Sequence, residues 1–153
     1  MKLVEIVPED SIVLELNAKS KVEVLRELVG ALKASGVELD VDDAVNVLLE
    51  REKLGSTGIG EGVAIPHAKV NGLKNVVGAF GRSIRGIDFE SLDGKPVNLF
   101  FLLLAPMEST GAHLKALAKA SKMLKNPELR ERLMAATRRE EVVEVMKKVD
   151  ELG

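Results

Sequence analysis

The near-continuous apolar run from Val97 to Leu104 is the feature that most constrains how this chain can fold. A strand with one exposed face alternates apolar and polar residues, so this run predicts a strand that is covered on both faces. Helical patterns precede and follow the strand patterns, which supplies helices for both faces. We therefore expect an α/β fold, a three-layer sandwich with a mixed β-sheet flanked by helices on both faces.

Five segments open with a residue that can cap a helix N-terminus and continue with apolar residues at helical spacing. The predicted caps are Ser20, Asp40, Ser109 or Thr110, Asn126 and Thr137. Two of these form a capping box with a glutamate three residues later, Ser20 with Glu23 and Thr137 with Glu140. The first helix should end near Gly36, the second should stop at Gly55 and the third should reach Lys125.

Other segments predict the remaining strands. Ile12 to Leu16 and Val76 to Phe80 are expected to be strands, whereas Ile84 to Phe89 is either a third strand or a connection. The segment from Gly55 to His67 contains glycines at 55, 58, 60 and 62. We expect this glycine-rich segment to be a structured loop that enters a strand rather than a regular element.

Composition excludes several classes of protein. The chain has no cysteine, so a disulfide framework or a thiolate metal site is excluded. A net charge of −2 without Trp or Tyr gives no basic or aromatic surface for nucleic acid. The longest apolar run, Leu99 to Pro106, is far short of the ~20 residues of a membrane helix, and Met1 to Asp10 lacks a signal-peptide pattern. We expect one domain over residues 1–153, cytoplasmic and without membrane insertion.

Motifs for nucleotide binding and for acyl hydrolysis are absent from the sequence. A phosphate-binding loop needs a lysine where Glu61 follows Gly60, and a dinucleotide fingerprint needs a glycine where Val63 stands. The GxSxG motif of hydrolases does not occur. No cofactor is therefore expected.

The only two histidines are the strongest candidates for chemistry. His67 follows the stiff Pro66, and glycine N–H groups ahead of it could converge on an oxyanion. In the alternative interpretation the glycines serve tight turns and His67 forms hydrogen bonds within a core. His113 lies in the first turn of a predicted helix, where the helix dipole favours a neutral ring that can donate one N–H; it could equally be a buried capping histidine.

Arg51 and a metal-site alternative complete the candidates. Arg51 borders the apolar face of the second predicted helix and could project its guanidinium toward the glycine-rich segment, although such an arginine is more often a surface residue. His67, His113 and Glu61 could supply three metal ligands, but no HxxxH or HExxH spacing fixes a pair on one face. The sequence therefore favours a site without metal.

Two blocks of sequence resemble a known family. The run from Arg51 to Lys69, REKLGSTGIGEGVAIPHAK, is similar to the signature around the phosphorylated histidine in IIA proteins of the bacterial phosphotransferase system, of the mannitol, fructose and nitrogen-regulatory type. Gly86 to Leu124, with GIDFESLDGKPVNLFFLLLAP and the following HLKALAKASKML, also resembles that family. The resemblance covers essentially the whole chain and implies an α/β domain that carries a phosphoryl group.

The resemblance also implies roles for individual residues. His67 matches the phosphoacceptor, His113 the second histidine beside it, and Arg51 the arginine that organises the phosphate. With these assignments, N–H groups of the glycine-rich segment are expected to stabilise the phosphoryl oxygens. The residues expected to form this phosphate loop are Ser56, Thr57, Gly58, Gly60, Glu61 and Gly62.

The implied partners are a phosphorylated HPr-type carrier as donor and either a IIB component or a regulatory target as acceptor. No IIB or membrane domain occurs in the sequence, and its GIDFESLDGKPV segment resembles the nitrogen-regulatory branch as well as fructose carriers. These features favour a regulatory role over sugar transport. A histidine-based metal-binding protein and a non-catalytic regulatory binding protein are the alternative functions.

Overall fold

The computed structural model describes residues 1–152, and its sheet is centred on β6 (Val97–Pro106). From Leu99 onward every residue of β6 is buried. Leu99, Phe101 and Leu103 point into one hydrophobic core, whereas Phe100 and Leu102 point into a second core on the opposite face. The strand is thus covered on both faces, as the apolar run predicts.

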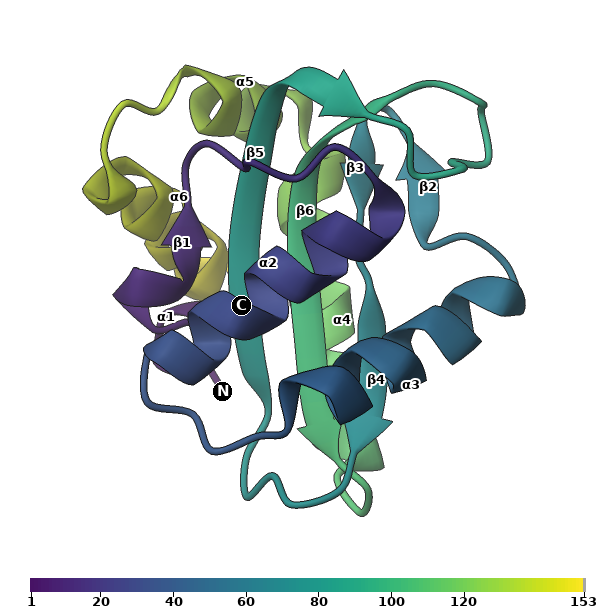
Figure 1. Cartoon of the computed structure of the whole chain (residues 1–153). Helices are drawn as coiled ribbons and strands as arrows, with labels where there is room; N and C mark the ends of the chain where they lie inside the picture. Colours follow the sequence, from purple (N-terminus) through teal and green to yellow (C-terminus); the bar gives the residue numbers. More distant parts are fainter. Residues whose placement is uncertain (153) are drawn as a thin grey trace.

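The sheet has six strands and mixed directions (Figure 1). Its order is β1-β5-β6-β3-β2, and β4 also pairs with β6. The β5–β6 and β2–β3 pairs are antiparallel, and the β1–β5, β3–β6 and β4–β6 pairs are parallel. The bounds of the other strands are Ile12–Val13 for β1, Gly58–Gly60 for β2, Val63–Ala64 for β3, His67–Val70 for β4 and Val77–Ile87 for β5.

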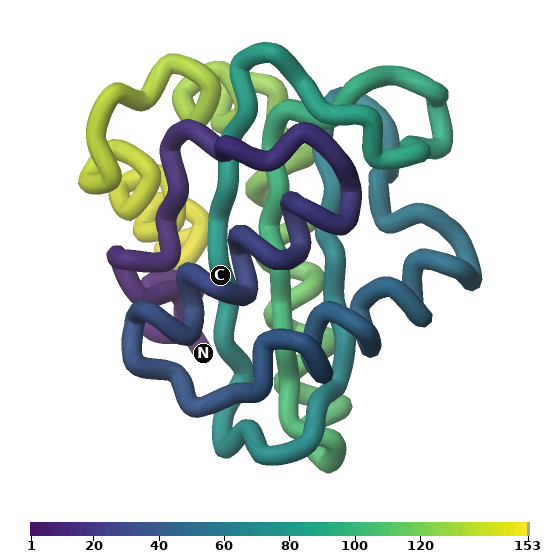
Figure 2. Tube along the Cα trace, in the orientation of Figure 1, coloured from purple at the N-terminus to yellow at the C-terminus, as the bar shows by residue number. Residues whose placement is uncertain are grey.

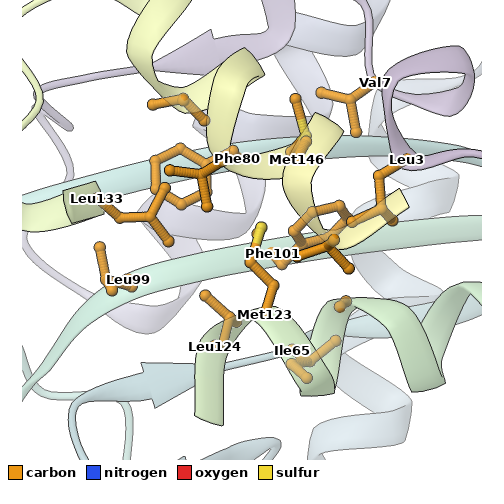
Figure 3. Close-up of a cluster of buried hydrophobic side chains, with 14 of the residues drawn as sticks. Leu3, Val7, Ile65, Phe80, Leu99, Phe101, Met123, Leu124, Leu133 and Met146 are labelled. Carbon is orange, nitrogen blue, oxygen red and sulfur yellow. The ribbon is translucent and has the colours of Figure 1, made fainter. Parts of the chain in front are cut away.

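Helices cover both faces of the sheet, which confirms the predicted three-layer α/β sandwich (Figure 1). One face carries α2 (Lys21–Ala34) and α3 (Val41–Lys53). The other carries α1 (Leu3–Ile6), α4 (Thr110–Lys125), α5 (Pro127–Ala135) and α6 (Arg139–Glu151). Figure 3 shows the core on the side of α1, α4, α5 and α6, in which Phe80 and Phe101 from the sheet pack among Met123, Leu133 and Met146 from the helices.

The helix caps confirm most of the predicted starts. The side chains of Ser20, Asp40 and Asn126 each accept a hydrogen bond from the backbone N–H three residues later. Ser109 precedes α4 without a side-chain cap. The last box is one residue later than predicted: Glu141, not Glu140, accepts hydrogen bonds from the backbone N–H groups of Thr137 and Arg138.

The chain termini are joined by a buried carboxylate that the sequence pattern does not reveal. Asp150 near the end of α6 accepts hydrogen bonds from the backbone N–H groups of Leu3 and Val4 at 2.7 and 3.3 Å, and it pairs with Lys119 of α4 at 3.3 Å. These contacts stabilise the short α1, which was not predicted. They also remove Lys119 from the exposed stripe that Lys115 and Lys122 form on α4.

Three strand predictions need correction. β1 covers only Ile12 and Val13 rather than continuing to Leu16. The segment from Ile84 to Ile87 is the end of the long strand β5, with a register shift after Arg82. The glycine-rich segment does contain regular structure, because β2 and β3 form a hairpin within it. Figure 2 shows the chain leaving α3, rising to β2, reversing, and descending through β3 into β4.

Within residues 1–152 there is no helix with the length and apolar character needed to cross a membrane.

Candidate functional site

His67 is the first residue of β4 and lies opposite Leu103 of β6. Alternation along β4 directs Ala68 and Val70 into the core beneath α2 and α3, so His67 and Lys69 lie on the side of α4. The neighbouring Pro66 has no N–H, but its carbonyl accepts a hydrogen bond from the N–H of Leu103 at 2.9 Å. The start of the strand, and with it the histidine backbone, is therefore fixed by the sheet.

The imidazole of His67 is held in one tautomer by its hydrogen bond. Its Nδ1 lies 2.7 Å from the carbonyl oxygen of Ile65. A carbonyl only accepts, so Nδ1 must carry the proton and Nε2 of the neutral ring carries the lone pair. Burial is the largest influence on the pKa of His67 and lowers it, and the Arg51 charge lowers it further. The hydrogen bond to Ile65 and the Glu52 charge raise the pKa but do not outweigh burial. The neutral form of the ring is favoured near pH 7.

His113 lies beside His67, as the resemblance implies. The two ring centroids are 5.6 Å apart with an interplanar angle of 65°. His113 is 7% exposed, and its Nε2 has no hydrogen-bond partner among residues 1–152. Burial is the main cause that lowers the pKa of His113, followed by the charges of His67 and Lys69. The ring is favoured in its neutral form, although burial rather than the helix dipole is the leading reason.

Arg51 lies in the last turn of α3 at the edge of the same site. Its Nη1 donates a hydrogen bond to the carbonyl of Gly55 at 2.9 Å. None of the ion pairs formed within residues 1–152 includes Arg51. Its charge contributes to the lowered pKa of His67. The structure thus brings two neutral imidazoles together and places at the edge of their site a guanidinium that has no carboxylate partner among residues 1–152.

In the part of the glycine-rich segment nearest His67, two backbone N–H groups of the predicted phosphate loop are bonded within the protein. The backbone N–H of Thr57 donates to the buried carboxylate of Glu52 at 3.2 Å. The backbone N–H of Gly58 donates to the hydroxyl of Ser56 at 3.0 Å, and that hydroxyl donates to the carbonyl of Phe89 at 3.0 Å. The N–H groups of Thr57 and Gly58 are already committed to the protein, so they do not converge on an anion.

The far part of the segment is the turn of the hairpin between β2 and β3. Gly60, Glu61 and Gly62 have φ values of 98°, 59° and 74° and reverse the chain between β2 and β3. The carboxylate of Glu61 lies 3.9 Å from Arg130 of α5. The register of the hairpin sets this turn at the end away from His67, because Gly60 pairs with Val63 while Ile65 is next to Thr57.

The metal-site alternative fails on the same geometry. His67 and His113 are adjacent, but Glu61 faces Arg130 on the hairpin turn. The part of the chain that the structure describes, residues 1–152, has no group of three or more His, Cys, Asp or Glu side chains placed to hold a metal ion.

Two charged residues near the site are not among the candidates that the sequence indicates. Lys69 follows His67 on the same side of β4, and its Nζ donates to the hydroxyl of Thr110 at 2.6 Å at the start of α4. Glu52 is 8% exposed and lies behind the loop next to Arg51. A signal for Glu52 existed, since it falls on the apolar stripe of α3 with Val45 and Leu48.

Comparison with known proteins reveals one family. The model of the family described as "Phosphoenolpyruvate-dependent sugar phosphotransferase system, EIIA 2" matches residues 5–149. A nitrogen regulatory protein of Bradyrhizobium diazoefficiens is 44% identical over 137 residues, which cover 89% of this chain and 88% of that protein. The fructose-specific EIIABC component of Bacillus subtilis is 38% identical over 150 residues, but these span 98% of this chain and only 24% of that protein.

The crystal structure of the nitrogen regulatory protein IIA-Ntr from Neisseria meningitidis has the same fold. It superimposes with a TM-score of 0.86 at 41% identity, covering 93% of this chain and 97% of that one.

Proposed function

Because the chain belongs to the EIIA type 2 family of the phosphoenolpyruvate-dependent sugar phosphotransferase system, we propose that it is a phosphocarrier whose His67 accepts a phosphoryl group from a phosphorylated HPr-type protein. The observation that carries this proposal is the hydrogen bond between His67 Nδ1 and the Ile65 carbonyl. It leaves a lone pair on Nε2, which is the atom a nucleophilic histidine needs.

The transfer is a displacement at phosphorus. The Nε2 lone pair of His67 forms a bond to the phosphorus carried by the donor, while the bond from phosphorus to the donor imidazole breaks and its electron pair returns to the donor nitrogen. The proton on Nδ1 stays in place, hydrogen-bonded to Ile65, and partly offsets the charge on the phosphorylated ring. The step as written transfers only the phosphoryl group, from one imidazole nitrogen to another.

Arg51 and His113 have the chemistry to stabilise the phosphoryl oxygens during transfer. The Arg51 guanidinium has no carboxylate partner among residues 1–152 and can offer a charged N–H fork to two oxygens. The buried Nε2 of His113 has no partner in the unphosphorylated protein. When its proton is on Nε2, the neutral ring can donate a hydrogen bond to a phosphoryl oxygen carried by His67. Because backbone N–H groups of Thr57 and Gly58 are committed elsewhere, these side chains carry most of the stabilisation.

Donor and acceptor must reach the same nitrogen in turn, so the partner surface surrounds His67. Exposed apolar side chains flank the site: Leu54 at the end of α3 is 85% exposed, Met107 after β6 is 49% exposed, and Leu114 beside His113 is 61% exposed. Such residues suit the apolar centre of a protein interface. An amide-shift titration with an unphosphorylated HPr-type protein should perturb this rim, whereas shifts limited to Lys115 and Lys122 would contradict it.

The acceptor is either a cysteine-bearing IIB protein or a regulatory target. We favour regulation, because the 44% identity to a nitrogen regulatory protein is higher than the 38% identity to the fructose-specific protein. Transfer of phosphate from this protein to a IIB protein from the same cell would instead support sugar transport. Binding of the unphosphorylated form to a kinase, transporter or transcription factor would support the regulatory role.

The direct test is phosphorylation with a phosphorylated HPr-type donor. Wild-type protein should gain one acid-labile phosphate on His67 Nε2, detected by mass spectrometry and by ¹⁵N shifts of the imidazole. His67→Ala should gain none, whereas His113→Ala should still be phosphorylated but more slowly. If His67→Ala acquires the same phosphate, the assignment of the phosphoacceptor is wrong.

A further inference from the structure

A buried ion pair lies behind the loop that precedes β2. The side chain of Glu52 on α3 is 4% exposed and that of Lys21, the first residue of α2, is 14% exposed; their charged atoms are 3.0 Å apart. Lys21 also lies 4.8 Å above the ring of Phe89 and 3.5 Å from Glu90. A carboxylate this deeply buried must be paired and hydrogen-bonded to be tolerated, and Lys21 supplies the countercharge.

The same carboxylate holds the loop. Its Oε1 accepts the backbone N–H of Thr57 at 3.2 Å, and its Oε2 accepts the hydroxyl of Thr57. Thr57 is buried, so both of its donors are satisfied by one side chain. Glu52 therefore fixes the position and the orientation of Thr57.

A series of hydrogen bonds continues from Thr57 to the phosphoacceptor. The carbonyl of Thr57 accepts the N–H of Ile65 at 3.1 Å, and the carbonyl of Ile65 accepts the Nδ1 proton of His67 at 2.7 Å. Ile65 is 6% exposed and has no freedom to turn without losing its packing. The orientation of the carbonyl that selects the His67 tautomer thus depends on Thr57, which depends on Glu52.

Arg51 and Glu52 are neighbours on α3, but their side chains point in different directions and bind different partners. Here Lys21 and Thr57 occupy both oxygens of Glu52, while Arg51 donates to the carbonyl of Gly55. The guanidinium has no carboxylate partner among residues 1–152, so its charge is available for a phosphoryl group.

We propose that Glu52 is a positioning residue for phosphoryl transfer, acting through Thr57 and Ile65 to hold the ring of His67 with Nε2 as the nucleophile. This inference rests on the proposed function only for the reaction that it serves; the geometry of the unphosphorylated ring can be measured without any donor. Residues so placed set the reacting atom to within a fraction of an ångström, and misplacement by about 1 Å can cost a hundredfold in rate.

The charges around His67 agree with this placement. From α3, Arg51 lowers and Glu52 raises the pKa of His67, while the neutral ring of His113 faces it from α4. Lys69, next along β4, acts on the pKa of His113. Removing the Glu52 charge should therefore shift the His67 titration to lower pH.

The test compares Glu52→Gln with Glu50→Gln. Glutamine keeps the size of Glu52 but loses its charge and one acceptor, whereas Glu50 is an exposed residue of the same helix that pairs with Lys53 at 2.8 Å. Imidazole ¹⁵N spectra of the unphosphorylated proteins report the tautomer and the titration of His67. In Glu52→Gln we expect a larger fraction of the Nε2–H tautomer, a lower titration midpoint, and a transfer rate reduced about tenfold to a hundredfold at a nearly unchanged KM for the donor.

Thr57→Val tests the same series of hydrogen bonds with a second variant. It removes only the hydroxyl that Oε2 accepts, and we expect a smaller shift in the same direction in both readouts. If Glu52→Gln does not fold, Thr57→Val decides by the same two measurements. Folded variants with the wild-type tautomer and transfer rate would overturn the proposal. Failure of wild-type protein to accept phosphate would instead count against the proposed function, because the imidazole spectra are recorded without a donor.

Discussion

Residues 55–58 and residues 60–62 belong to one glycine-rich segment, yet different forces hold them. The near part, residues 55–58, is held by groups from outside it: the Arg51 side chain binds Gly55, the Glu52 side chain binds Thr57, and the backbone carbonyl of Phe89 binds Ser56. The far part, residues 60–62, reverses the chain through three successive positive φ angles and is tied to β6 by the backbone, since the carbonyl of Gly62 accepts the N–H groups of Asn98 and Leu99. The near part can therefore transmit changes to His67, whereas the far part serves the hairpin.

This contrast shows that glycine content alone does not indicate a phosphate cradle. Gly58 is required by space, since a Cβ there would lie 3.0 Å from the backbone Cα of Ser91. Gly60 and Gly62 are required by conformation, since L side chains rarely adopt their φ angles. Neither requirement involves an anion.

The largest expected effect comes from Arg51, which borders the near part. Arg51→Ala should reduce the transfer rate about a hundredfold, equivalent to ~2.7 kcal/mol of transition-state stabilisation. Thermal stability should change little, because the side chain loses a single exposed hydrogen bond to Gly55. Single-turnover transfer from a phosphorylated HPr-type donor measures the rate, and thermal unfolding measures the stability. A wild-type transfer rate in Arg51→Ala would remove it from the mechanism.

Gly58→Ala should produce the next largest effect, on stability. The added methyl group meets the backbone of Ser91, so the loop must shift, and overpacking of this kind typically costs about 1–3 kcal/mol. Because Gly58 adjoins Thr57, transfer should slow as well. Urea unfolding with Gly30→Ala as control checks this, since Gly30 lies within α2 with nothing within 4 Å of an added Cβ. Equal stabilities of the two variants would contradict the packing role of Gly58.

Gly62→Ala should have a smaller effect that is confined to stability. A left-handed backbone at φ 74° costs a non-glycine residue about 1 kcal/mol, and the added methyl group would lie 3.1 Å from the Asn98 side-chain oxygen. The transfer rate of the folded protein should equal that of wild type, because the far part does not contact His67. A slowed rate in fully folded Gly62→Ala would break the distinction between the two parts.

The smallest expected effect is on stability at mildly acid pH. Folding lowers the pKa of both His67 and His113, mainly through burial, so the unfolded chain binds more protons below its ordinary histidine pKa of about 6.5. Stability is therefore full above that pH and decreases as the pH falls toward the lowered pKa values. Urea unfolding at several pH values should show this slope, and a double His67→Gln/His113→Gln variant should lose it. A slope that persists in the double variant would assign it to other groups.

Local sequence was sufficient for most of the elements and for naming the candidate residues of the site. The apolar run at Val97 to Leu104 predicts a strand buried on both faces because burial follows directly from side-chain polarity. Ser20, Asp40 and Asn126 predict helix starts because a cap bonds an N–H only three residues away. His67, His113 and Arg51 are candidates because their residue types and the surrounding motif are visible in the chain itself.

Tertiary structure alone decided which hydrogen-bonding groups remain free. Glu52 finds its countercharge in Lys21, 31 residues away, and Ser56 finds its acceptor in Phe89, 33 residues away. These partners commit the N–H groups of Thr57 and Gly58, which the sequence assigned to phosphate, and they leave Arg51 without a carboxylate partner among residues 1–152. The physical reason is that a polar group bonds to whatever the packing of the chain brings within about 3 Å, and local patterns carry no information on contacts between distant segments.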